Sequence, residues 1–146
     1  MKIAKLILIC LCFFSCRSPY RKISKNTNFI EYPCELKNHL NDTILVSGIY
    51  VNCMEYSYFN LLKKDDCDTN FDMNLDFNNV EFTNKIDKKI NEMQGCGVYM
   101  KMILRGILHK DVHAAYGHLG TNNAEFEVLE FINTGKVKHF KIKTNE

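Results

Sequence analysis

Residues 43–51 read TILVSGIYV, a run rich in β-branched and aromatic side chains that is typical of a β-strand. Gly48 lies near the middle of the run, and a glycine inside a strand pattern indicates a bulge or a sharp bend. Strand character continues in Cys53–Leu62 and again in Phe71–Phe77, where apolar residues alternate with acids and amides. The sequence therefore predicts three consecutive strands, the first of them bent.

The periodicity then changes from that of a strand to that of a helix. Apolar residues recur at helical spacing from Phe82 to Met93, which predicts a helix over residues 84–94 with Asn84 as its N-cap. Strand character returns in three further segments, Val98–Leu108, Ala124–Ile132 and Val137–Ile142. The last segment is short and basic, as suits an edge strand, because lysines discourage pairing with another chain.

This order of elements resembles the OB-fold, a five-stranded Greek-key barrel. In that fold a bend lets the first strand pair on both sides of the barrel, and Gly48 lies where the bend is needed. The runs SGIY at residues 47–50 and YGHLG at residues 116–120 also resemble those of small uncharacterised bacterial lipoproteins. The resemblance implies a mainly β domain over residues 36–146, a five- to six-stranded OB-like Greek-key barrel with one helix between strands three and four.

Many OB-folds bind oligonucleotides or oligosaccharides on strands two and three. By this analogy Tyr56 and Tyr58, in the second predicted strand, are candidate ligand-binding residues, because their rings can stack on a sugar or an apolar group. In the alternative they only pack on the barrel, which is the usual role of aromatic residues in strands. A fold alone does not establish a function.

The first sixteen residues have the features of an export signal. Lys2 and Lys5 precede the apolar stretch Leu6–Phe14, which is much shorter than the about 20 residues of a membrane-spanning helix. The run Phe-Phe-Ser-Cys that ends at Cys16 resembles the lipobox of bacterial lipoproteins, in which a small residue precedes the cysteine that is acylated. We therefore expect acyl chains on Cys16, and the alternative is cleavage and release as a soluble protein.

The expected division is a signal peptide over residues 1–15, a membrane tether over residues 16–35 and a lipid-anchored domain at the bacterial cell envelope, facing the periplasm.

Charge is distributed unevenly along the chain. Residues 16–30 carry four basic side chains and no acid, which suits an anionic bilayer surface. Residues 31–130 hold nine basic and sixteen acidic side chains, a balance of −7, and residues 131–146 return to +3. Because nucleic-acid binders present a basic stripe, the acidic body predicts no nucleic-acid partner.

Four cysteines remain beyond the predicted lipidation site, Cys34, Cys53, Cys67 and Cys96. An even number in an exported domain predicts two disulfides. Zinc binding is an alternative, although no C-x-x-C pair is present, and free thiols are another. The OB resemblance implies the pairing. In that topology the end of strand one lies near the start of strand four, and its start lies near the turn between strands two and three. The resemblance thus implies Cys34–Cys67 and Cys53–Cys96.

Three histidines, His109, His113 and His118, fall within one predicted loop. With the acidic turn at residues 65–68 they are candidate metal ligands, although their spacing matches no established site. In the alternative His118 orders a tight loop through backbone hydrogen bonds, and it is also a candidate ligand-binding residue.

The chain contains neither a Gly-rich phosphate loop nor a G-x-S-x-G motif. We therefore expect a non-enzymatic binding or interaction module without a cofactor. Its expected partners are the membrane, through the lipid anchor, and an envelope protein or glycan. The alternative is a metal-binding or metal-assisted hydrolytic protein that uses the histidine loop.

Overall fold

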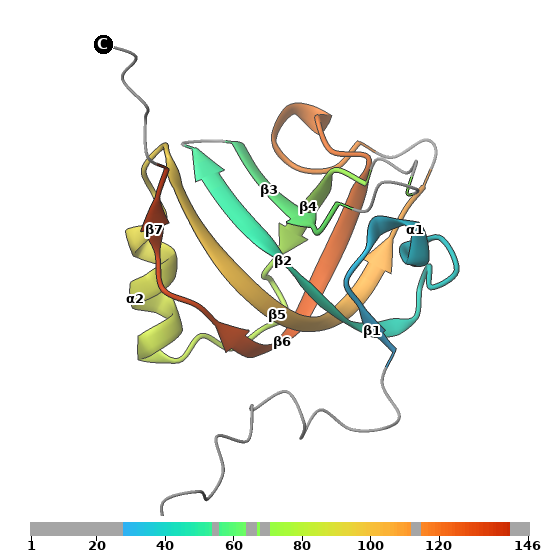
Figure 1. Cartoon of the computed structure of the whole chain (residues 1–146), viewed down its shortest axis with the longest axis horizontal. Coiled ribbons are helices and arrows are strands. Elements are labelled where there is room, and N and C mark those ends of the chain that lie inside the picture. The colour runs from blue at the N-terminus through green and yellow to red at the C-terminus, as the bar shows by residue number, and fades with distance from the viewer. Residues whose placement is uncertain (1–27, 54–55, 64–66, 68–70, 112–114, 141–146) are drawn as a thin grey trace, which may run out of the picture.

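The computed structural model of the chain describes residues 28–53, 56–63, 67, 71–111 and 115–140 (Figure 1). The signal peptide, Cys16 and His113 lie outside these residues. The elements, in chain order, are β1 (Phe29–Ile30), α1 (Pro33–Leu36), β2 (Thr43–Cys53), β3 (Tyr56–Leu61), β4 (Met73–Asp76), α2 (Asn84–Glu92), β5 (Val98–His109), the 3-10 turn η3 (His118–Gly120), β6 (Ala124–Thr134) and β7 (Lys138–His139). No helix among the described residues is long and apolar enough to cross a membrane.

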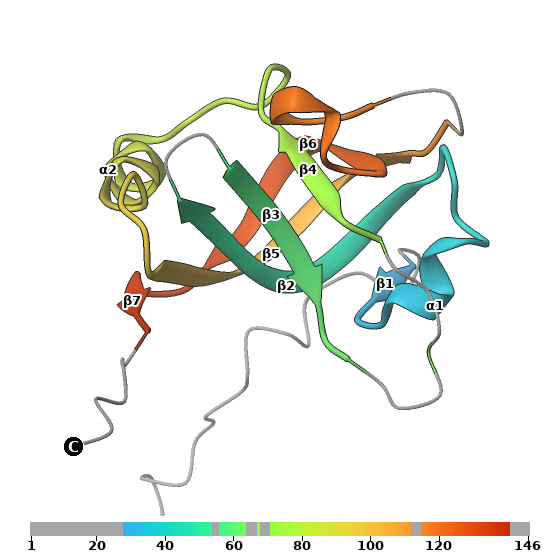
Figure 2. The same cartoon turned by 90° about the horizontal axis from the view of Figure 1, so that it is seen from above.

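Five strands close into a barrel, in the order β2–β3–β4–β6–β5 and back to β2. The pairs are antiparallel except for β4 and β6, which run parallel. Figures 1 and 2 show these strands wrapped around one interior, with α2 and α1 at opposite ends. The mainly β fold class, an OB-like barrel with one helix between its third and fourth strands, is confirmed.

Gly48 lies in β2, a strand that pairs on both of its edges. Residues 43–52 pair with β5 along one edge, while the other edge pairs with β1 at Leu45–Val46 and with β3 from Gly48 onward. A Cβ atom at Gly48 would lie 2.6 Å from Cζ of Phe59 and 2.6 Å from the carbonyl oxygen of Asn60. Only glycine leaves room for the Phe59 ring here. The pairing of β2 with β3 and β5 runs through Gly48 without a bulge, so the structural reason for this glycine is the close approach of that ring.

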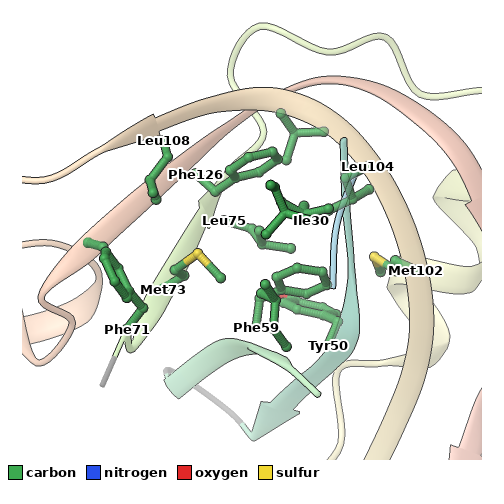
Figure 3. Packing of buried hydrophobic residues seen from close by; sticks show 14 of the residues in the cluster. Ile30, Tyr50, Phe59, Phe71, Met73, Leu75, Met102, Leu104, Leu108 and Phe126 are labelled. Atoms are coloured by element: carbon green, nitrogen blue, oxygen red, sulfur yellow. The ribbon is translucent and has the colours of Figure 1, made fainter. Parts of the chain in front are cut away.

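The inward-facing residues of all five strands form one core (Figure 3). Its largest fully buried side chains include Phe59 from β3 and Phe126 from β6. Leu36 of α1 is fully buried, as is Met93 directly after α2, so each helix contributes to the core. The ammonium group of Lys89 on α2 donates hydrogen bonds of 2.7–2.9 Å to Thr134 and Gly135, which ties that helix to the end of β6.

Two local predictions are corrected by the structure. The N-cap of α2 is Thr83 and not Asn84, because the Thr83 hydroxyl accepts a hydrogen bond from the backbone N–H of Ile86. The segment predicted as a tether over residues 16–35 gives its last residues to the barrel, where β1 pairs with β2 and Ile30 is buried. A strand of two residues is too short to show a periodicity, which is why the sequence analysis missed it.

Both predicted disulfides are present in the structure. Cys34, in α1, is joined to Cys67, between β3 and β4, with a Cα–Cα distance of 5.2 Å. Cys53, at the end of β2, is joined to Cys96, just before β5, with a Cα–Cα distance of 4.0 Å. The OB topology that implied this pairing is therefore consistent with both crosslinks.

Candidate ligand-binding face

The outer face of β3 exposes two tyrosine rings. Residues in a strand alternate between its two faces, and Phe59 and Leu61 point into the core. Tyr56 and Tyr58 therefore lie outward, with exposed fractions of 49% and 40%. The candidate tyrosines are thus surface residues, available to a ligand.

The described part of the loop between β5 and β6, residues 115–123, is held at its base by hydrogen bonds. Tyr116 and Asn122 exchange two backbone hydrogen bonds of 3.2 and 3.1 Å, and Asn122 is buried. The next residue, Asn123, bonds to Asp72 at the start of β4: its N–H donates to the Asp72 carbonyl oxygen, and its side-chain oxygen accepts from the Asp72 N–H. The loop is therefore fixed to the barrel next to β4.

This loop brings His118 to β3. The rings of His118 and Tyr56 are 5.7 Å apart between centroids and nearly perpendicular, an edge-to-face contact. These two candidate residues, which are 62 positions apart in the chain, therefore lie together. We call the group of Tyr56, Tyr58, His118 and Leu119 the β3–loop face.

Leu119 is the exposed tip of this face. Its side chain is 76% exposed, and its backbone has φ 56° and ψ 18°. This left-handed conformation is unfavourable for a bulky L-residue, and such backbone strain is concentrated at functional sites. An apolar side chain held in solvent by a strained backbone is the most unusual local feature of the loop, and the sequence analysis did not identify it.

A row of polar side chains continues from the tyrosines across the outer surface. The register that joins Phe59 to Met73 places Tyr58 opposite Asn74 of β4. Asn74 pairs with Glu125 of β6 and donates a hydrogen bond of 3.2 Å to its carboxylate. Glu125 in turn pairs with His109 of β5. An aromatic ring, an amide, a carboxylate and an imidazole therefore follow one another over four strands.

The Glu127 carboxylate contacts His109, the last residue of this polar row. It lies 3.0 Å from Nε2 of His109 and accepts a hydrogen bond of 2.7 Å from the Asn79 amide. These two hydrogen bonds, that of His109 foremost, lower the pKa of Glu127 below its ordinary value. Glu127 therefore stays ionised and holds the His109 ring in place.

The described histidines do not assemble a metal site. His109 is engaged by Glu127 and His118 contacts Tyr56, and no group of three metal-ligating side chains occurs in the described ranges. His113 and the acidic residues Asp65, Asp66 and Asp68 lie outside those ranges.

Two features near the candidate tyrosines carry no prediction from the sequence: the left-handed backbone at Leu119 and the outward Glu125–Glu127 pair. The glutamates could have been found, because in AEFEVLEFI they alternate with buried Phe126 and Val128 and must face outward. No sequence pattern marks a leucine that adopts positive φ.

In comparisons with known proteins, no protein family, no curated protein and no solved structure matches this chain.

Proposed function

We propose that the chain is a bacterial envelope lipoprotein, anchored through acyl chains on Cys16, whose barrel is a non-enzymatic module that binds an envelope glycan. The anchor rests on the basic and apolar pattern of residues 1–16 and the small residue before Cys16. Several acyl chains hold a protein firmly on a membrane, whereas one binds only marginally.

The observation that carries the ligand class is the exposed tyrosine pair beside the polar row. A sugar ring has an apolar face, which stacks on aromatic rings, and a rim of hydroxyl groups, which pair with amides and carboxylates. Tyr56 and Tyr58 supply the first, and Asn74 and Glu125 supply the second. The Glu125 carboxylate repels phosphate, which disfavours an oligonucleotide on this face.

The binding test uses the detergent-solubilised full chain, which is sedimented with isolated peptidoglycan and screened against an array of bacterial glycans. The double change Tyr56→Ala and Tyr58→Ala should weaken retention roughly tenfold or more, since loss of about 1.4 kcal/mol of stacking has that effect. Phe82→Ala is the matched control, because Phe82 is a 39% exposed aromatic residue outside β3 and outside the loop that holds His118. Equal retention of both variants and the parent would contradict the assigned face, and retention of an envelope protein in place of glycan would change the ligand class.

The anchoring test is separate. Cys16→Ala should abolish labelling by a fatty-acid probe in the expressing bacterium, while Cys34→Ala should leave the labelling intact. Unchanged labelling of the Cys16→Ala variant would refute the lipid anchor without bearing on the β3–loop face.

A further inference from the structure

A second surface of the barrel has the opposite character. The segment 135–140 runs along the start of β5, where Lys138 pairs with Tyr99 and His139 with Val98. Backbone hydrogen bonds of 2.8 Å fix both of its ends, from Gly135 to Lys101 and from Phe140 to Gly97. Figure 1 shows β7 at the edge of the barrel.

This edge contains a hollow of about 320 Å³ lined by Tyr99, Lys101, Gly135, Lys136 and Lys138. The three lysines are exposed, and the lining has no acidic side chain. Three ammonium groups around one hollow are suited to a phosphate group, which offers several acceptor oxygens and a negative charge.

Aromatic side chains flank the lysines. The rings of Tyr99 and Phe140 stack with centroids 4.8 Å apart, and Phe140 is half exposed. Aromatic rings concentrate at the level of lipid headgroups, and lysines there keep their ammonium groups among the phosphates. We call the set Tyr99, Lys101, Lys136, Lys138 and Phe140 the β5–β7 basic patch. Lysines on an edge strand can be explained by the need to prevent aggregation through that edge. This need does not explain the stacked rings of Tyr99 and Phe140 beside the lysines.

We propose that the β5–β7 basic patch binds the phosphate groups of anionic membrane lipids, so that the barrel docks on the bilayer by its β7 edge. This goes beyond the proposed function, because it adds a membrane contact other than the acyl anchor. The chain between Cys16 and Asn28 can span about 40 Å when extended, which is enough for an edge of a small barrel to reach the surface. Tethering also makes the contact effectively intramolecular, so a weak patch suffices.

The test exploits the absence of tryptophan from the chain. In the full chain, Phe140→Trp places one fluorescent reporter in the patch, and Tyr58→Trp places the matched reporter on β3. With vesicles of phosphatidylglycerol and phosphatidylcholine, we expect a blue shift and quenching by brominated lipid for Phe140→Trp only. The response should disappear in 1 M salt, where the Debye length falls to about 3 Å. It should also be absent with pure phosphatidylcholine, even though the apolar N-terminus can still insert.

Charge reversals complete the design. In the Phe140→Trp chain, Lys136→Glu with Lys138→Glu should abolish the response to anionic vesicles. Lys37→Glu with Lys63→Glu changes the net charge equally and should leave most of the response. An equal response to neutral vesicles, or an equal loss with both charge pairs, would overturn the proposal.

Saturation by glycerol phosphate without any vesicle response would indicate an ion site alone, and a response only to single-stranded DNA would indicate a nucleic-acid surface. Either result would also overturn it.

Discussion

The β3–loop face and the β5–β7 basic patch are two surfaces of one barrel that differ in both charge and construction. The first combines outward residues of β3 with a loop from another part of the chain, and carboxylates and amides adjoin it. The second combines the start of β5 with the segment 135–140 that pairs along it, with lysines and no acid around its hollow. The formal net charge of +2 for the whole chain conceals this separation.

The difference in construction leads to different expectations for ligand binding at the two surfaces. Hydrogen bonds fix the position of the loop that holds His118, so under the proposed function we expect the first surface to select a ligand by its shape. The second surface attracts through charges on flexible side chains, so its binding should depend on salt more than on ligand shape. Four predictions break or sharpen this contrast, from the largest effect to the smallest.

Phe59→Ala should damage both surfaces together, because Phe59 is a residue of β3 whose buried ring packs over Gly48 of β2. Removing a buried phenyl ring typically costs about 3–5 kcal/mol of folding free energy. Denaturant unfolding should therefore show a large fall in stability. Phe82→Ala is the control, since Phe82 is 39% exposed and should cost much less. A loss confined to the β3–loop face would mean that the two surfaces do not share a core.

Loss of a disulfide should affect one region more than the other. Replacing both members of either pair with alanine should cost about 2–4 kcal/mol, and the sequence separations of 33 and 43 predict similar costs. Without Cys53–Cys96, hydrogen exchange should accelerate most at the amide of Phe140, which donates to Gly97 beside Cys96. Without Cys34–Cys67, it should accelerate most at Leu62, which donates to Glu31. The same exchange pattern in both variants would contradict this local assignment.

Leu119→Asn should stabilise the protein while weakening the β3–loop face. Asparagine tolerates the left-handed region better than leucine, so relief of strain should add about 1 kcal/mol to the folding free energy. Asn41 has φ 64° and supplies the reverse control, because Asn41→Leu should destabilise by a similar amount. Thermal unfolding measures both changes. A destabilised Leu119→Asn variant would show that the leucine side chain supports the fold.

Glu127→Gln should have the smallest effect, and a pH-dependent one. Hydrogen bonds from His109 and Asn79 lower the pKa of Glu127 in the folded state, so its ionised form favours folding. That contribution is present above the ordinary carboxyl pKa and is lost as pH falls through the lowered folded value. The parent should therefore be more stable than Glu127→Gln at neutral pH, and the two should converge in acid. Thermal unfolding of both proteins across this pH range measures the difference, and equal stability of the two proteins at neutral pH would contradict the assigned role of the Glu127 hydrogen bonds.

Much of the fold could be predicted from the sequence, because its signals are local. Alternation in Phe71–Phe77 and the helical spacing after Phe82 each fixed an element type from neighbouring residues alone. The two disulfides followed from the implied barrel topology. Boundaries were less accurate, since Thr83 and Asn84 can both cap a helix and only the backbone conformation distinguishes them.

The candidate face could be predicted only in part. Tyr56, Tyr58 and His118 were identified as residue types, but their grouping depends on a loop fixed to β4 by hydrogen bonds between Asp72 and Asn123. The positive φ of Leu119 and the burial of Ile30 likewise depend on contacts between distant segments.

The sequence by itself determined the order of the five barrel strands and of the helix between them, and the separation of an acidic body from a basic end. These properties follow from the spacing of apolar residues and the position of charges along the chain. The tertiary structure alone decided that His118 meets Tyr56, and that Tyr99 and Lys101 join Lys136 and Lys138 around one hollow. The physical reason is that barrel closure and strand register bring together residues far apart in sequence, and no local pattern encodes those distances.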